Sequence, residues 1–241
     1  MSQKAALITG ASSGIGLAIA HLLGEEGFAL TVSARRPDKL ERAAAELRDA
    51  GYDVHVVPAN MQSEEDIVAL FESHREARGR LDVLVNNAGV GLGTPVADIT
   101  GKGIDMQMDV NFKAIVVGYR EGVGLLREAA AEHGSALVVN TSSISGKHGQ
   151  GWLSVYSATK AAVVGFTEAM NKELGAEGIK STALCPAFVE TPMTEFAVDM
   201  GVKAEEMMRP SDIAEAVRML LRQSRACIVP EVMFIRPGET L

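Results

Sequence analysis

Short apolar runs rich in β-branched residues alternate along this chain with segments of helical periodicity. The helical segments repeat their apolar residues every three or four positions, as Ile19, Leu22 and Leu23 do. This alternation is typical of a parallel sheet whose strands are joined by right-handed crossover helices. The predicted strands span residues 5–9, 29–34, 53–58, 81–86, 136–141, 180–185 and 227–234.

The apolar runs are nearly continuous, which indicates strands that are covered on both faces of the sheet. The chain contains no Gly/Ser-rich or Pro-rich linker and no internal repeat. We therefore expect an α/β fold across residues 1–241, a single doubly wound, Rossmann-type parallel sheet of about seven strands.

Residues 188–208 break the alternation, because they hold loosely spaced apolar side chains and no clear strand. A long insert at the C-terminal end of a strand is where a substrate-binding lid lies in such folds. We expect residues 188–208 to form this lid, with an ordinary helical connection as the alternative.

The composition excludes several functional classes. The net charge is −8 and no long Lys/Arg run occurs, so we expect no nucleic-acid partner. No apolar run is long enough to span a membrane, and the N-terminus lacks the pattern of a signal peptide. Cys185 and Cys227 are too few for a disulfide framework, and the histidines have no metal-ligand spacing. These observations predict a cytoplasmic protein with reduced thiols and no metal.

The first predicted strand runs directly into the glycine-rich sequence GASSGIG at residues 10–16, and a helical segment follows. A turn this tight needs residues without a β-carbon, and its backbone must let a pyrophosphate approach the N-terminus of the helix. The strand before the turn and the helix after it are the context that a dinucleotide site requires. The spacing is G-x-x-x-G-x-G, with Gly10, Gly14 and Gly16 as its members.

The end of the second predicted strand indicates which dinucleotide would bind. A site for the unphosphorylated cofactor places Asp or Glu there, against the ribose 2′-hydroxyl. This chain has Arg35 and Arg36 instead, and a guanidinium group pairs with a 2′-phosphate. We expect NADP(H) as the cofactor, with two solvated surface arginines as the alternative.

Tyr156 and Lys160 lie four positions apart at the start of a predicted helix, so they share one of its faces. A phenol with a pKa of about 10 is a poor acid or base near neutrality. A neighbouring ammonium group favours the phenolate and lowers that pKa toward the working range. A surface pair without function is the alternative reading of these two residues taken alone.

Polar residues follow two other predicted strands, at the edge of the sheet where ligands bind in this architecture. Ser142 and Ser143 come after the fifth strand, and Asn87 follows the fourth. Asn111 interrupts a long helical stretch in which asparagine is a poor helix former. Local turns and a helix kink are the alternatives to a functional role.

Taken together, these motifs resemble the short-chain dehydrogenase/reductase family, in its single-domain branch of about 250 residues. The resemblance covers nearly the whole chain. It rests on the TGASSGIG sequence at 9–16, the NNAG sequence at 86–89, Asn111, Ser143 thirteen positions before Tyr156, and the Tyr156-x-x-x-Lys160 pair.

The resemblance implies a role for each of four residues. Tyr156 would be the general acid/base, and Ser143 would hold the substrate's carbonyl oxygen. Lys160 would bind the nicotinamide ribose and lower the pKa of Tyr156. Asn111 would hold a water molecule that connects Lys160 to solvent.

The chain departs from the family pattern at three places. Asn60 and Met61 stand where an Asp and an apolar residue usually lie near the adenine, and Ala187 replaces the glycine that usually follows Pro186. Ser13 stands where many NADPH reductases have Lys or Arg.

The cofactor-binding residues expected are Gly10, Ser12, Ser13, Gly14, Ile15, Gly16, Arg35, Arg36, Asn60, Met61, Asn87, Ala88, Gly89, Tyr156, Lys160, Pro186, Val189 and Thr191.

We expect an NADP(H)-dependent oxidoreductase that acts on an apolar carbonyl compound or secondary alcohol. The residues expected to contact this substrate are Ser143, Tyr156, Trp152, Phe188, Met193 and Phe196. A non-catalytic dinucleotide-binding regulator is the alternative, and it would not need Ser143, Tyr156 and Lys160 together.

By resemblance we expect a homotetramer or homodimer. The small residues Ala158, Ala161, Ala162, Gly165 and Ala169 would lie either in its interface or against the sheet.

Overall fold

Seven parallel strands form one sheet with the order β3-β2-β1-β4-β5-β6-β7. The structure is a computed structural model that describes residues 3–194 and 202–238. The strands are β1 (Ala5–Thr9), β2 (Ala29–Ser33), β3 (Val54–Val56), β4 (Val83–Asn86), β5 (Ala136–Thr141), β6 (Ile179–Pro186) and β7 (Glu231–Phe234). The α-helices are α1 (Gly14–Glu25), α2 (Pro37–Asp49), α3 (Glu64–Arg78), α4 (Gly101–Met108), α5 (Ala114–His133), α6 (Ser154–Leu174) and α8 (Pro210–Leu221).

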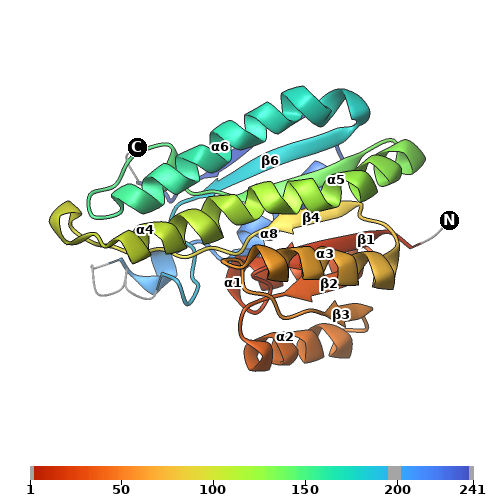
Figure 1. Ribbon diagram of the computed structural model, residues 1–241, viewed down its shortest axis with the longest axis horizontal. Coiled ribbons are helices and arrows are strands. Elements are labelled where there is room, and N and C mark those ends of the chain that lie inside the picture. The colour runs from red at the N-terminus through yellow and green to blue at the C-terminus, as the bar shows by residue number, and fades with distance from the viewer. Residues whose placement is uncertain (1–2, 195–201, 239–241) are drawn as a thin grey trace.

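Helices cover both faces of this sheet, as the continuous apolar runs predict. One core lies under α1, α2 and α8 and includes Ile8 of β1, and the other lies under α3, α5 and α6 and includes Leu7. Neighbouring residues of one strand thus enter opposite cores, because successive side chains point to opposite faces. Figure 1 shows α3 and α5 lying across the face of the sheet nearest the viewer. The predicted doubly wound α/β fold in a single domain is confirmed.

The two edge strands are shorter than predicted. β3 spans Val54–Val56 rather than 53–58, and β7 spans Glu231–Phe234 rather than 227–234. An edge strand pairs on one side only, and proline has no N–H with which to continue a ladder. Pro230 lies just before β7, and Pro58 lies beyond β3, although backbone hydrogen bonds from Val57 to Val32 and from Ala59 to Ala34 continue past the end of that strand.

The long helical stretch after Gly101 is not one regular helix. A π-helical turn, η2 (Asp109–Lys113), separates α4 from α5, and Asn111 lies at its centre. Turns of this kind insert an extra residue into a helix and are frequent at functional sites. The interruption predicted at Asn111 is therefore a change of helix type.

The order of the strands determines where a ligand can bind. β1 pairs with β2 on one side and with β4 on the other, so the chain runs outward from β1 to β3 and then crosses back to β4 on the opposite side of β1. Ligands bind in the crevice outside the carboxyl ends of the strands at such a switch point. In the described part of the chain, no helix combines the length and apolarity that a bilayer crossing requires.

Candidate active site

The glycine-rich turn between β1 and α1 leaves the start of the helix open to a ligand. Gly10 and Gly14 have φ angles of 68° and 56°, a left-handed conformation that favours glycine. Helix α1 begins at Gly14, and its N-cap residue Ser13 makes no side-chain hydrogen bond to the first turn. The first N–H groups of α1 are thus available to an anion at the positive end of the helix dipole.

Gly16 packs closely against the glycine-rich turn. Of all the residues expected to bind the cofactor, it alone does not line the cleft described below. A β-carbon at Gly16 would lie 2.3 Å from the carbonyl oxygen of Gly10 and 2.5 Å from Nδ2 of Asn87. Gly16 therefore allows the helix to pack tightly against the turn, which keeps the turn close to β4.

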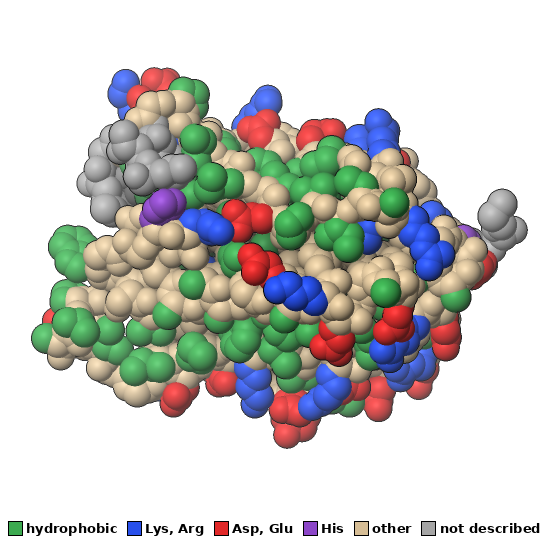
Figure 2. All heavy atoms as spheres, turned by 90° about the horizontal axis from the view of Figure 1, so that it is seen from above, with side chains coloured by type: hydrophobic (Ala, Val, Ile, Leu, Met, Phe, Trp, Pro, Cys, Tyr) green, Lys and Arg blue, Asp and Glu red, His purple; other side chains and the backbone are tan. Residues whose placement is uncertain are grey.

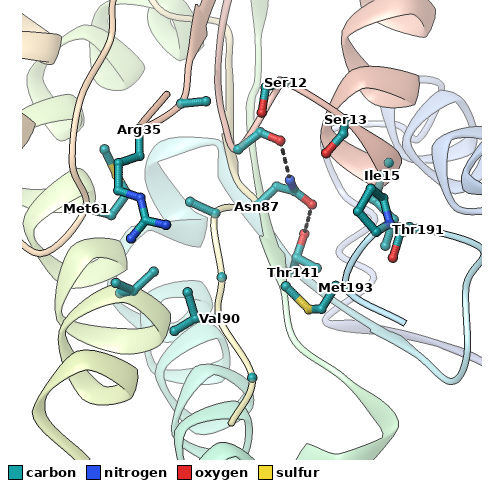
Figure 3. A pocket seen from close by; sticks show the side chains of 18 of the residues that line it. Ser12, Ser13, Ile15, Arg35, Met61, Asn87, Val90, Thr141, Thr191 and Met193 are labelled. Carbon is teal, nitrogen blue, oxygen red and sulfur yellow. Dashed lines mark hydrogen bonds between the residues drawn. The ribbon is translucent and has the colours of Figure 1, made fainter. Parts of the chain in front are cut away.

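A cleft of about 590 Å³ opens at the carboxyl edge of the sheet and extends past the glycine turn. This volume lies within the usual range for sites of small ligands and cofactors. Figure 3 shows Arg35 and Met61 on one side of the cleft and Thr191 and Met193 on the other. The predicted cofactor-binding residues that line it are Gly10, Ser12, Ser13, Gly14, Ile15, Arg35, Arg36, Asn60, Met61, Asn87, Ala88, Gly89, Tyr156, Lys160, Pro186, Val189 and Thr191.

Asn87 connects the glycine turn to the end of β5. Its Nδ2 donates to the carbonyl oxygens of Thr9 and Gly10, both at 3.3 Å. Its Oδ1 accepts a hydrogen bond of 3.1 Å from Oγ1 of Thr141 (Figure 3). The Asn87 side chain therefore holds the dinucleotide end of the cleft in a constant position relative to Ser143 and Lys160.

The two arginines predicted to select the cofactor lie at the wall of the cleft. Arg35 and Arg36 are exposed, and neither forms a salt bridge within residues 3–194 and 202–238. Asn60 also lines the cleft, and its Oδ1 accepts a hydrogen bond from the backbone N–H of Gln62. The guanidinium groups are thus free to pair with an anion at this end of the cleft.

Ser143 and Tyr156 come together at the opposite end of the cleft, where β5 and α6 meet. Their hydroxyl groups form a hydrogen bond, although they lie on different elements. Burial raises the pKa of Tyr156, and the hydrogen bond to Ser143 opposes that rise. This direction differs from the expected lowering by Lys160. Desolvation of the phenolate dominates in the protein alone, and Nζ of Lys160 lies 5.6 Å from the centre of the ring.

Lys160 is 3% exposed and is held at both ends by the last residue of β5 and the residue that follows it. Its Nζ donates to the carbonyl oxygen of Thr141 at 2.7 Å. Its own backbone carbonyl accepts from Oγ of Ser142 at 2.8 Å. Burial lowers the pKa of Lys160 to about 8, so most Lys160 side chains are still protonated at neutral pH.

Asn111 is fully buried and uses its side chain to hold other backbone groups. Its Oδ1 accepts from the N–H of Val90 at 2.8 Å, and its Nδ2 donates to the carbonyl oxygen of Val90 at 2.8 Å. Nδ2 also donates to Oγ1 of Thr159, which in turn donates to the carbonyl oxygen of Tyr156. The π-helical turn is thereby tied to the segment after β4 and to α6.

The residues predicted to contact the substrate are divided by the structure. Ser143, Tyr156 and Met193 line the cleft. Trp152 does not, because its side chain is 70% exposed and borders a neighbouring hollow. Phe188 is also outside the cleft lining, and the guanidinium of Arg236 lies 5.1 Å from the centre of its ring. Phe196 lies outside the described residues.

Part of the predicted lid segment can be described. Val189 forms a parallel bridge with Met208, so the two ends of the segment 188–208 are paired. Val189 and Thr191 line the cleft from this segment, and Ala187 does so just before it. Residues 195–201 of the predicted lid lie outside the described residues.

Reasoning from the sequence assigned no specific role to three residues, of which Ser142 alone was noted as a polar residue at the edge of the sheet. Ser142 holds the backbone of Lys160, Gly146 lets that backbone come close, and Gln107 holds the backbone of Leu92. The signal for Ser142 and Gly146 was their place in the serine- and glycine-containing loop after β5. Gln107 had no signal except its position one helical turn before Asn111. Among the described residues, no group of three His, Cys, Asp or Glu side chains could hold a metal ion.

Comparison with known proteins agrees with this geometry. The family model for short chain dehydrogenases matches residues 4–200. An uncharacterized oxidoreductase of Staphylococcus aureus (strain MRSA252) is 35% identical over 237 residues, covering 98% of both chains. A variant of actinorhodin polyketide ketoreductase, solved with NADPH, matches with a TM-score of 0.87 at 33% identity, covering 99% of this chain and 98% of that one. A 3-ketoacyl-(acyl-carrier-protein) reductase from Brucella melitensis, solved with NADH, matches with a TM-score of 0.88 at 28% identity, covering 98% of each chain.

The chain belongs to the short-chain dehydrogenase/reductase family. It is an oxidoreductase of the hydride-transferring type with a site for a nicotinamide dinucleotide. The open N-terminus of α1 and the cleft beside it fit the pyrophosphate of such a cofactor, because no side chain caps the first N–H groups of the helix and Gly14 and Ile15 line the cleft.

Proposed function

We propose that this protein is an NADP(H)-dependent reductase of an apolar ketone or aldehyde, or a dehydrogenase of the corresponding alcohol. The observation that carries the proposal is the meeting of Ser143, Tyr156 and Lys160 at one end of a cleft whose other end holds two free arginines. A protein that only binds a dinucleotide has no use for this constellation.

The chemistry assigned to these residues follows from their surroundings. The nicotinamide ring, when bound, supplies the hydride. The Ser143 hydroxyl donates a hydrogen bond to the carbonyl oxygen as negative charge develops on it. Tyr156 transfers its phenolic proton to that oxygen, and the ammonium group of Lys160 then stabilises the phenolate that remains.

The surroundings of Tyr156 and Asn111 bear on this route. Burial raises the pKa of Tyr156, which weakens the phenol as an acid, and the hydrogen bond to Ser143 opposes that rise. The side-chain amide of Asn111 is already bonded to Val90 and Thr159. We therefore assign any water that returns protons to Lys160 to the backbone carbonyl of Asn111.

Substitution of the phenol tests the catalytic assignment. We expect Tyr156→Phe to lower the kcat of ketone reduction by at least about a thousandfold, because general acid catalysis supplies factors of this size. The Kd of NADPH should stay nearly the same. The assay follows NADPH consumption with aldehydes, cyclic and aromatic ketones and 3-oxoesters. Substantial residual activity would remove Tyr156 from its role. Tight NADPH binding without turnover of any carbonyl by the wild type would favour the regulator.

The preference for NADP(H) is tested at the other end of the cleft. Replacing Arg35 and Arg36 by Ala together removes two charge-assisted contacts to the 2′-phosphate. We expect NADPH affinity to fall by about 10- to 100-fold while NADH affinity changes little. Calorimetric titration with both dinucleotides measures the two constants. Equal affinities in the wild type would contradict the proposed preference.

We also propose that the protein assembles as a homodimer or homotetramer through α6. Ala158, Ala161, Gly165 and Ala169 are exposed in the single chain, and Ala162 is half-buried, so this stripe does not face the sheet. A β-carbon at Gly165 would meet no atom within 4 Å. Figure 2 looks down on the molecule from the α6 side and shows apolar side chains interspersed with charged ones. A second copy of α6 could approach this stripe closely.

A further inference from the structure

Three glycines at alternate positions of the segment after β4 lie beside the start of α6. A β-carbon at Gly89 would lie 3.5 Å from Nζ of Lys160, and one at Gly91 would lie 3.6 Å from Cδ2 of Tyr156. A β-carbon at Gly93 would lie 3.8 Å from Cδ2 of Leu153. The β-carbon positions of all three glycines therefore face Lys160, Tyr156 and Leu153, and the segment 89–93 presents backbone without side chains to them at these positions.

The residues between these glycines are held by hydrogen bonds from side chains to their backbone groups. In a sheet, such backbone groups would be bonded to a neighbouring strand. Asn111 makes two hydrogen bonds to the backbone of Val90, both 2.8 Å long. Oε1 of Gln107 accepts a hydrogen bond of 3.2 Å from the N–H of Leu92. Positions 107 and 111 are one helical turn apart and lie on the same helix face. The amide side chains of Gln107 and Asn111 therefore hold the segment 89–93 in place by hydrogen bonds to its backbone.

Gln107 is committed to this contact. Its side chain is 3% exposed, and its Nε2 donates to the carbonyl oxygen of Gly103 at 3.3 Å, which orients the amide. Leu92 lines the main cleft and also a hollow of about 130 Å³ behind it, which Gln107, Trp152 and Val155 border. Leu92 is 38% exposed and borders both the cleft and this hollow.

We propose that Gln107 is a positioning residue that fixes Leu92 and thereby sets the size of the substrate that the cleft accepts. The inference rests on the proposed ketone reductase function for its substrate. Without the bond from Gln107, Leu92 can move toward the hollow and the two spaces merge. Small ketones then lose contact with the wall, and bulky ketones gain room. The reacting carbonyl, held by Ser143 and Tyr156, is not displaced.

The first measurement needs no substrate. Gln107→Met keeps the length of the side chain and removes both amide groups, whereas Gln107→Glu keeps an acceptor for the N–H of Leu92. We expect hydrogen exchange at the Leu92 amide to accelerate by about fivefold or more in Gln107→Met, the factor that loss of one hydrogen bond brings. Exchange at Val90 should remain slow, and Gln107→Glu should restore protection at Leu92. Unchanged exchange at Leu92 would overturn the positioning role.

The second measurement compares two ketones, cyclohexanone and the bulkier 2-tetralone. Steady-state kinetics give KM and kcat for each ketone, and calorimetry with NADP⁺ present gives the Kd of each. In Gln107→Met we expect KM and Kd for cyclohexanone to rise about fivefold relative to those for 2-tetralone. The kcat and the Kd of NADPH should stay within about twofold of wild type, and Gln107→Glu should recover the original ratio. Equal changes for both ketones, or no binding of either by the wild type, would overturn the specificity role.

The two proposals fail in different ways. Activity that survives in Tyr156→Phe would refute the catalytic assignment, and that variant should leave exchange at Leu92 unchanged. Failure of the Gln107 proposal would leave the requirement for Tyr156 intact. A general loss of thermal stability in Gln107→Met with an unaltered ratio of the two ketones would show a structural role alone.

Discussion

Individual buried polar residues show how much the interior of this protein depends on hydrogen bonds. Lys160 and His74 are both buried, and burial disfavours the charged form of each side chain. In the proposed mechanism the charge of Lys160 stabilises the phenolate of Tyr156. His74 has no such role, because it lies in the core between α3 and the sheet, with its ring nitrogens 2.8 Å from Oγ1 of Thr31 and 2.8 Å from the carbonyl oxygen of Arg80.

His74 makes stability depend on pH. Burial lowers its pKa from 6.5 to about 4 in the fold. The unfolded chain then binds more protons than the native state between these two values, so stability falls as pH drops through that window. We expect a loss of about 3 kcal/mol when the whole window is crossed.

The measurement is urea unfolding of wild type and His74→Gln between pH 4 and 6.5, the window set by the pKa of His74. The variant should be less stable at neutral pH and should show a flatter dependence on pH. The exposed His148 serves as a control, because His148→Gln should keep the wild-type slope. An unchanged slope in His74→Gln would contradict the assignment.

At the scale of elements, the contact between the end of β5 and α6 determines the catalytic geometry. Thr141, Ser142 and Ser143 are consecutive, and they bind the ammonium group of Lys160, the backbone of Lys160 and the phenol of Tyr156 respectively. A shift of α6 relative to β5 would disturb all three contacts at once. The short helix η3 (Ile144–Gly146) that follows β5 packs against α6 at this point.

Gly146 is the residue that permits this close contact. A β-carbon there would lie 2.6 Å from the carbonyl carbon of Lys160 and 2.9 Å from Oγ of Ser142. We expect Gly146→Ala to move α6 outward and to lower kcat by about 100-fold, because catalysis is sensitive to misplacement of about 1 Å.

Gly149 provides the matched control in the same loop, since a β-carbon there would meet no atom within 4 Å. Gly149→Ala should therefore keep wild-type kcat. Kinetics are compared with circular dichroism to show that both variants fold. Full activity in Gly146→Ala would mean that α6 can shift without consequence for the site.

At the scale of the whole molecule, the outer face of α6 offers the proposed surface for a second copy. We expect Gly165→Arg to dissociate the assembly, because a long charged side chain would stand where two helices approach closely. Light scattering coupled to size-exclusion chromatography measures the mass. Ala77→Arg on the exposed face of α3 is the control and should leave the mass unchanged. A monomeric wild type would contradict the proposal.

Much of the architecture was predictable from local patterns. The seven strands follow from periodicity, and the family follows from the resemblance carried by its motifs; both are confirmed. The individual cofactor-binding residues stay predictions. The catalytic roles of Ser143, Tyr156 and Lys160 stay predictions, although the structure brings all three to one cleft. The edges of the sheet were overextended because a strand's end depends on whether a neighbour pairs with it.

The sequence by itself determined the alternation of strands and helices, the glycine turn and the shared helix face of Tyr156 and Lys160. Each of these depends on spacing along the chain, which backbone geometry converts directly into position. Only the tertiary structure decided that Trp152 is exposed, that Gly16 serves packing, that burial raises the pKa of Tyr156, and that Gln107 holds Leu92. Those properties depend on which distant segments meet and how much water they exclude. Contacts between distant segments produce no regular spacing of residues in the sequence from which they could be predicted.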